Sequence, residues 1–291
     1  MRDSTDADGE RGSVAIAFSA AMRVVVPSAF IVGIAWLLII VHRRVYDGML
    51  LESSYQVEIA SLDVPFDPDW ARPAADDPVP AAFPFRGKVG VLTTPDFPKR
   101  LAAYYESSPW VDHVDKIEVR LPNQVRVRVV VREPVVAVAW EDTHYLVDKR
   151  GVRLPGAYSD LSQVPYELFR VTGVVATLPR PGERWNDPGI PAGVAVAAAL
   201  RDAGVDGAVG TDVIDVSNVD GRLDPNRSEI VLRTRDLTSI EWGRSPWTKK
   251  YGEPSMDQKL ENLRLALSAA PGLRGVKRLK LQFDRPYMAY R

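Results

Sequence analysis

Few residues of this chain have the types and spacing that catalysis or metal binding requires. The three histidines, His42, His113 and His144, stand far apart and show none of the spacings of a metal site. Glu241 and Glu253 flank the tryptophan-rich stretch WGRSPW, and such a pair of carboxylates would suit glycoside hydrolysis. Polar residues around exposed aromatic side chains are more often ordinary surface, so we favour that interpretation.

The sequence motifs of common enzyme classes are also missing. The chain contains no G-x-S-x-G nucleophile elbow, no G-x-x-x-x-G-K phosphate loop and no G-x-G-x-x-G dinucleotide motif. The stretch VSNVDGRLDPNR has a glycine where a calcium loop turns, but Val216 and Arg227 occupy its first and last ligand positions. We therefore expect no catalytic, cofactor-binding or metal-binding residues and do not expect an enzyme.

Composition is that of a globular protein. The 291 residues are 46% hydrophobic and 26% charged, and this length allows about two domains of roughly 100–200 residues. A formal net charge of −1 gives no reason to expect a nucleic-acid partner. The chain has no cysteine, so disulfides, zinc–thiolate sites and thiol catalysis are excluded.

An apolar stretch near the start predicts a transmembrane helix. Residues 24–41, VVVPSAFIVGIAWLLIIV, carry no charge, and this length is near the lower limit for crossing a bilayer core of about 30 Å. We prefer this interpretation to a buried core helix, and to a signal peptide because no good cleavage site follows Val41. Arg23 precedes the stretch and Arg43 and Arg44 follow it, so charge alone gives only a slight bias in orientation.

Residues 53–133 predict a small α+β unit in the order strand, helix, strand, strand. Period-two alternation indicates the strands, and a capping aspartate with an apolar face indicates the helix, which is free to cover one face of the sheet. The expected elements cover residues 55–64, 96–108, 114–119 and 125–131. The proline-rich stretch Pro65–Pro84 is expected to be an exposed loop or insertion.

Glu133-Pro134 interrupts a long run of strand-like sequence. Valines alternate with arginines up to Val131, and a new valine-rich run follows from Val135 to Trp140. Pro134 lacks a backbone donor and would end a central strand. We interpret this point as a stiff joint between two strands, and a β-bulge within one sheet is the alternative.

Residues 134–291 predict a mostly antiparallel β domain with packed helices. The expected strands cover residues 135–140, 144–148, 151–155, 169–175, 213–216, 230–234, 237–242 and 279–283. One helix is expected over 194–201 and a second after Ser255, where Ser255 and Gln258 form a capping box and Pro271-Gly272 ends the helix.

The order and spacing of these segments resemble the bacterial cell-division family FtsQ, called DivIB in other lineages. The matching segments are PWV (109–111), REPVVA (132–137), YLVDKRG (145–151), IEWGR (240–244), DQKLENLRLAL and LKLQF. The resemblance implies a cytoplasmic tail over 1–23, a transmembrane helix over 24–41, a polypeptide-transport-associated (POTRA) domain over 53–133 and an FtsQ-like β domain over 134–291. In that family Glu133-Pro134 would be the joint between the last two domains.

The resemblance also implies a function. Members of the family are scaffolds of the division machinery, held in the cytoplasmic membrane by one helix with most of the chain outside, and located at the division septum. Their last β-domain strand receives a segment of the small coiled-coil protein FtsB, which pairs with FtsL. An unpaired strand edge supplies main-chain hydrogen bonds, and alternate side chains supply specificity. The residues expected to contact the partner here are Arg244, Lys280, Gln282, Phe283, Tyr287 and Tyr290.

We expect each of these residues in a particular place. Leu279, Leu281 and Phe283 would face the core, whereas Lys280 and Gln282 would lie outward beside the incoming strand and Arg244 would pair with a partner carboxylate. Alternatively, Arg244 and the tyrosines form an ordinary amphipathic surface. Two other functions stay open, a POTRA-type protein of outer-membrane transport and a single-pass membrane-anchored enzyme or sensor.

Overall fold

The computed structural model describes residues 28, 30–48, 56–58, 85–90, 94–120, 123–164, 167–248 and 252–291. These residues form two compact units. The first contains the described residues up to Glu58 together with Phe85–Phe97 and Glu118–Arg126, and the second contains Pro98–Ile117 and Val127–Arg291. The stretch Pro65–Pro84 and most of the predicted strand over 55–64 lie outside the described residues.

The transmembrane helix predicted over residues 24–41 is not borne out. Residues 30–48 are helical, but none of the helices in the described ranges combines the length and the apolar character needed to cross a membrane. Arg43, Arg44 and Asp47 lie within the described helix. Residues 24–27 and 29 of the predicted span lie outside the described residues.

The first unit contains a short antiparallel pair of strands. β1 (Gln56–Glu58) pairs with β2 (Lys88–Gly90), and Val57 lies opposite Val89. Phe85 packs against Phe97 with 4.8 Å between the ring centroids, and the Phe97 side chain is fully buried. These contacts give the unit its apolar centre.

The predicted helix over 96–108 and the strands that follow it are confirmed. α2 (Phe97–Glu106) buries Leu101 and Tyr105. β3 (Val111–Arg120) and β4 (Gln124–Val131) form a two-stranded sheet. The alternation of valine and arginine in β4 therefore indicated the correct secondary structure.

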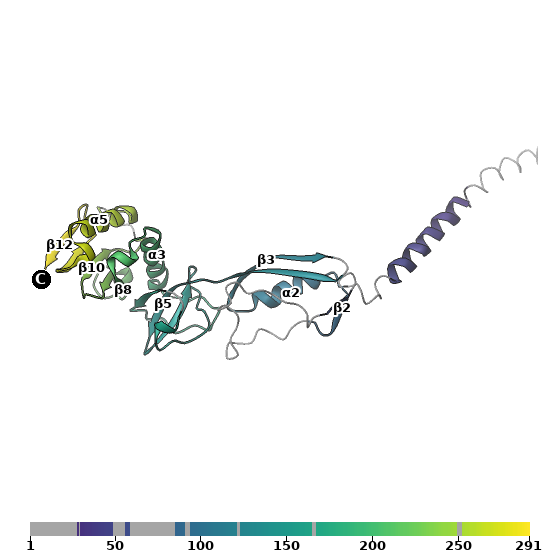
Figure 1. The fold of residues 1–291 in the computed structure, drawn as a ribbon, viewed down its shortest axis with the longest axis horizontal. Coiled ribbons are helices and arrows are strands. Elements are labelled where there is room, and N and C mark those ends of the chain that lie inside the picture. The colour runs from purple at the N-terminus through teal and green to yellow at the C-terminus, as the bar shows by residue number, and fades with distance from the viewer. Residues whose placement is uncertain are drawn as a thin grey trace, which may run out of the picture. The chain divides into compact units, whose positions relative to one another are not determined.

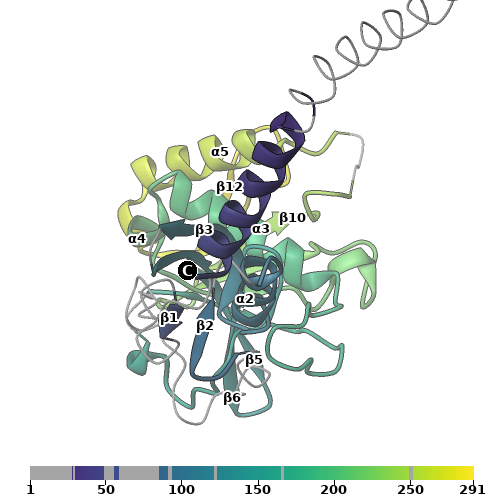
Figure 2. The same ribbon diagram turned by 90° about the vertical axis from the view of Figure 1, so that its right-hand side faces the viewer.

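The second unit contains an eight-stranded sheet in the order β12-β11-β10-β9-β8-β7-β5-β6. Its strands are β5 (Pro134–Trp140), β6 (Thr143–Asp148), β7 (Phe169–Thr172), β8 (Thr211–Asp215), β9 (Ile230–Thr234), β10 (Ser239–Gly243), β11 (Val276–Lys280) and β12 (Tyr287–Tyr290). The predicted hairpin β9–β10 is confirmed, and so is the pairing of β5 with β6, which lie side by side in Figure 2. The predicted strand over 151–155 is wrong, because Val152 and Arg153 form only isolated bridges.

The sheet is mixed rather than simply antiparallel. β5 with β7, β7 with β8, and β10 with β11 are parallel pairs, and the other neighbours are antiparallel. Parallel neighbours need a crossover connection, which is usually a helix. α3 (Gly189–Asp202) connects β7 to β8, and α5 (Met256–Ala269) connects β10 to β11. In Figure 1 both helices lie on the same side of the strands labelled β8, β10 and β12.

The core lies between these two helices and one face of the sheet. Fully or almost fully buried side chains come from the helices and from alternate positions of the strands: Ile190, Val196, Leu200, Leu263 and Ala266, with Val138, Val171, Ile214, Leu232, Ile240 and Leu279. In β8 to β11, the residues that alternate with these buried ones point to the opposite face of the sheet. No helix covers that face in the described part of the chain.

α3 begins earlier than its sequence pattern indicates. The predicted helix starts at Val194, but the observed one starts at Gly189. A Cβ atom on Gly189 would lie 2.5 Å from the Cγ2 atom of Val216, and one on Gly193 would lie 3.0 Å from the Cγ2 atom of Val171. Glycine, a poor helix former, therefore occurs here because the helix approaches the sheet closely.

Asp187 fixes the entry to α3. Its side chain is buried and accepts hydrogen bonds from the backbone N–H groups of Gly189 at 2.7 Å, Val175 at 2.9 Å and Ala176 at 3.0 Å. Burial alone would raise the pKa of this carboxyl, but the three N–H donors and the Arg222 guanidinium together outweigh burial and lower it.

The joint at Glu133-Pro134 separates two sheets. β4 ends at Val131 in the two-stranded sheet, and β5 begins at Pro134 in the eight-stranded sheet. The alternative of a β-bulge within one sheet is therefore wrong. Between the strands, the backbone N–H of Arg132 donates to the carbonyl oxygen of Trp110 at 2.8 Å.

Ion pairs hold the side chain of Arg132 beside β3 and β6. Its Nη1 atom lies 2.8 Å from Asp148 Oδ2 and 3.0 Å from Asp112 Oδ1. Both carboxylates are buried, with 4% and 9% of the side chain exposed. Trp110 packs next to them in a small cluster with Ala137 and Leu146. Arg132 thus links the joint to β3 through Asp112 and to β6 through Asp148, in addition to the stiffness that Pro134 gives.

Candidate partner-binding site

The C-terminal edge of the sheet is formed by β12 and not by the strand that the sequence predicts. The predicted strand over 279–283 corresponds to β11, which lies between β10 and β12. The chain then reverses and returns as Tyr287–Tyr290. The sequence YMAY is short and lacks polar–apolar alternation, so periodicity gives no signal for this strand. The edge of the sheet is therefore β12, one strand further out than the sequence predicts.

β12 is an open edge in the described part of the chain. It has β11 as its one neighbour there, and the backbone N–H of Arg291 donates to the carbonyl oxygen of Gly275 at 2.9 Å. At the opposite edge, β6 is covered by the segment that follows it, through Leu154 N–H to Leu146 O at 2.8 Å and Tyr158 N–H to His144 O at 3.0 Å. Only an uncovered edge is free to pair with a strand from another chain.

Half-exposed aromatic side chains flank β12. They are Phe283, Tyr287 and Tyr290, with 50%, 57% and 60% of the residue exposed. Leu279 and Leu281 are fully buried as predicted. Phe283 is not in the core as predicted, because β11 ends at Lys280 and the following residues form the turn. Asn262 of α5 holds that turn by donating to the carbonyl oxygen of Phe283 at 2.9 Å.

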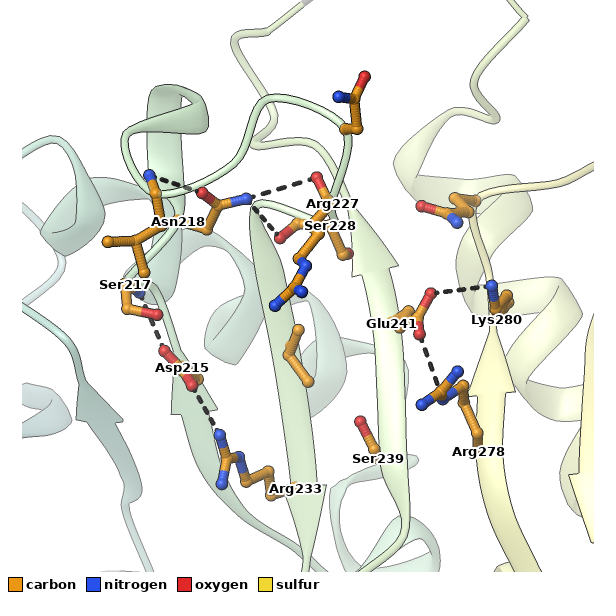
Figure 3. Close-up of a pocket in the computed structure, with 14 residues that line it drawn as sticks. Asp215, Ser217, Asn218, Arg227, Ser228, Arg233, Ser239, Glu241, Arg278 and Lys280 are labelled. Carbon is orange, nitrogen blue, oxygen red and sulfur yellow. Dashed lines mark hydrogen bonds and ion pairs between the residues drawn. The ribbon is translucent and has the colours of Figure 1, made fainter.

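A polar groove of about 640 Å³ lies on the uncovered face of β8 to β11. Lys280 and Arg278 of β11, Glu241 of β10 and Arg233 of β9 all line it, together with Gln282 from the turn before β12. Figure 3 shows Glu241 of β10 bonded to both Arg278 and Lys280 of β11, and Asp215 of β8 bonded to Arg233 of β9. Lys280 and Gln282 therefore lie on the open face, as the sequence predicts.

The charges in this groove do not balance. Lys280 and Arg278 share one carboxylate, Glu241, at 3.5 and 3.4 Å. Arg233 pairs with Asp215 at 3.0 Å, and Arg227, which also lines the groove, pairs with Asp224 at 3.1 Å. The Arg278 side chain is 53% exposed, so a carboxylate from a partner can reach it beside Glu241.

The rim of the groove is the loop 218–228, which Asn218 holds in place. The side-chain Nδ2 of Asn218 donates to the carbonyl oxygens of Asp224 at 2.8 Å and Ser228 at 3.1 Å. Its Oδ1 atom accepts from the N–H groups of Leu223 at 2.9 Å and Asp224 at 2.8 Å. This stretch resembles a calcium loop only superficially, and its role as a rim was missed. The nearest signal in the sequence is the run of turn-forming residues that begins at Asn218.

Arg244 is occupied within the fold. Its Nη1 atom lies 3.0 Å from Glu229 Oε1, and its Nη2 atom donates to the carbonyl oxygen of Pro225. The Arg244 side chain is 13% exposed and that of Glu229 only 1%. A partner carboxylate would have to compete with Glu229, so a direct contact from Arg244 stays a prediction.

The two carboxylates considered for hydrolysis make different contacts. Glu241 lines the groove, whereas Glu253 binds Lys259 of α5 and the backbone N–H of Arg244. Within the described ranges, no three or more His, Cys, Asp or Glu side chains are grouped so that they could hold a metal ion.

No protein-family model matches this chain. No curated protein matches it significantly in sequence.

Proposed function

We propose that this protein is a scaffold of the bacterial division machinery that binds a segment of an FtsB-like protein, itself paired with an FtsL-like protein, by adding it as a strand to β12. The observation that carries the proposal is the open edge of β12, with Phe283, Tyr287 and Tyr290 half-exposed around it. The resemblance of the sequence segments to the FtsQ family supplies the identity of the partner.

Strand addition explains how this edge binds. In an antiparallel pair, successive residues of a strand direct their N–H and C=O groups alternately to the two sides. The N–H of Arg291 points to Gly275, so the N–H groups of Tyr290 and Met288 point away from β11. They are available to a new strand, and each main-chain bond that forms contributes about 0.5–1.5 kcal/mol.

The groove supplies selectivity next to this edge. Lys280 and Gln282 line its β11 side, within reach of residues that precede or follow the added strand. The excess of positive charge favours a partner segment with acidic residues, and complementary charge raises the association rate and suppresses wrong partners. The aromatic residues at the edge supply apolar contacts, and tyrosine is enriched among the few residues that carry most of the binding energy in protein interfaces.

Co-purification of the full-length protein with the FtsB-like and FtsL-like proteins of the native host tests the proposal. Tyr290→Pro removes the outward N–H, whereas Tyr290→Ala removes only the ring and keeps that donor. We expect Tyr290→Pro to weaken binding at least about tenfold more than Tyr290→Ala, because a proline blocks strand addition. Binding that is equal in the two variants would contradict the role of the strand edge, and no co-purification of the wild type would contradict the function.

A further inference from the structure

The turn Ser245–Thr248 between β10 and α5 is fixed by its own hydrogen bonds. The backbone N–H of Thr248 donates to the carbonyl oxygen of Ser245 at 3.0 Å, and the two side-chain hydroxyls lie 2.9 Å apart. Pro246 occupies the second position of the turn, which its fixed φ favours. Trp247 occupies the third position and is 61% exposed.

A buried carboxylate, that of Glu229, accepts hydrogen bonds from this turn. Glu229, with 2% of the residue exposed, accepts hydrogen bonds from the N–H of Ser245 at 2.8 Å and the hydroxyl of Thr248 at 3.2 Å. It also pairs with Arg244 at 3.0 Å. Three groups that flank Trp247 in the sequence are therefore bonded to one side chain, that of Glu229 just before β9.

A second buried pair holds the far end of the same loop. Glu253 accepts from the backbone N–H of Arg244 at 2.6 Å and pairs with Lys259, whose side chain is 5% exposed. Gly243 makes this approach possible: its φ is +104°, and a Cβ atom there would lie 2.2 Å from Glu253 Oε1. Arg244, which follows β10, and Glu253, which precedes α5, are thus bonded to each other.

These contacts do not serve to bury Trp247. Trp185 and Trp242 are each 1% exposed and belong to the core, whereas Trp247 is left in solvent by a rigid turn. A tryptophan presented in a fixed position binds without the entropy loss of ordering it, and tryptophan is enriched among the residues that dominate interfaces.

We propose that Trp247 is a second anchor for the acidic partner segment that crosses the groove, where it contacts an apolar side chain of that segment. This inference rests on the proposed function. The turn is joined to the rim of the groove, because Arg244 beside the turn donates to the carbonyl oxygen of Pro225 in the loop 218–228. The acidic character of the occupant follows from Lys280 and Arg278, two cations that share the single carboxylate of Glu241. Arg244 accordingly acts as a positioning residue for Trp247.

The test measures the affinity of the full-length protein for the FtsB-like protein of the native host. Trp247→Ala is expected to weaken binding at least about tenfold, and Trp247→Phe is expected to restore part of the loss. Val175→Ala is the matched control, because Val175 is 68% exposed and contacts neither β12 nor the groove. Its affinity should equal that of the wild type.

Other outcomes overturn the proposal and distinguish it from the function. If Trp247→Ala binds like the wild type while Tyr290→Pro does not, the anchor is wrong and the strand edge stands. If Trp247→Ala dissociates a dimer of the full chain and leaves the partner affinity unchanged, the occupant is a second copy and the proposal fails. If the wild type does not bind, the proposed function fails and the inference fails with it.

Discussion

Replacement of Arg132 tests whether the joint between β4 and β5 is held by a buried charge network. Arg132→Met keeps most of the apolar stem and removes the guanidinium. Its loss leaves the Asp148 and Asp112 carboxylates, at 2.8 and 3.0 Å, without that cation in a buried site. Breaking a buried ion pair by removing one partner destabilises a protein by about 3–5 kcal/mol.

The lower end of that range applies here. Asp112 keeps Arg150 at 2.8 Å, and Asp148 keeps two backbone N–H donors, from Arg150 and Val152, both at 2.8 Å. We therefore expect a loss of about 3 kcal/mol, which corresponds to a Tm lowered by roughly 6–12 °C in a folded unit of this size. Tryptophan fluorescence follows the transition, because Trp110 is 5% exposed beside this cluster.

Arg128 provides a matched control on the same strand. It pairs with Asp115 at 3.4 Å, but the two side chains are 63% and 46% exposed. Arg128→Met should change stability by less than about 0.5 kcal/mol, since exposed pairs contribute little. Equal losses in the two variants, or a loss below about 1 kcal/mol for Arg132→Met, would refute the buried network.

Four further outcomes are expected. Gly189→Ala should destabilise the protein by about 1–3 kcal/mol in urea unfolding, because its Cβ would collide with Val216 at 2.5 Å, whereas Gly207→Ala, with no atom within 4 Å, should be neutral or stabilising. The unfolded chain protonates Asp187 before the folded protein does, so stability should fall as the pH drops below about 4, and Asp187→Asn should reduce this slope in acid titrations of unfolding. Phe283→Glu should weaken co-purification with the FtsB-like protein without lowering Tm, because the residue is 50% exposed. A fluorescent fusion should form a band at mid-cell before constriction, and an even rim around the cell would count against a division scaffold.

Local signals in the sequence predict much of the secondary structure. The Ser255 hydroxyl accepts from the backbone N–H of Gln258 at 3.2 Å, so the N-terminal cap of α5 is confirmed. The hairpin β9–β10 and the alternating strand β4 agree with their patterns because turn residues and period-two alternation act over a few residues. The same local reasoning fails where a contact distant in the sequence determines the structure. The start of α3 at Gly189 is an example, because Gly189 packs against Val216.

The candidate site is only partly predictable for the same reason. Lys280 and Gln282 lie on the open face as alternation predicts, but the strand order that adds β12 outside β11 arises from pairings that periodicity does not report. Asp215 and Arg233 line the groove from strands that are distant from β11 in the sequence. The sequence predicts a partner contact for Arg244, but its buried bond to Glu229 joins the residue after β10 to the residue before β9 and has no signal in the sequence.

Amide hydrogen exchange of the full-length protein, with and without the FtsB-like protein of the native host, tests the central claim most directly. If the partner adds a strand to β12, the outward N–H groups of Met288 and Tyr290 become protected on binding, while those of β6 at the covered edge do not change. Binding that leaves the exchange of residues 287–290 unchanged would contradict strand addition at this edge.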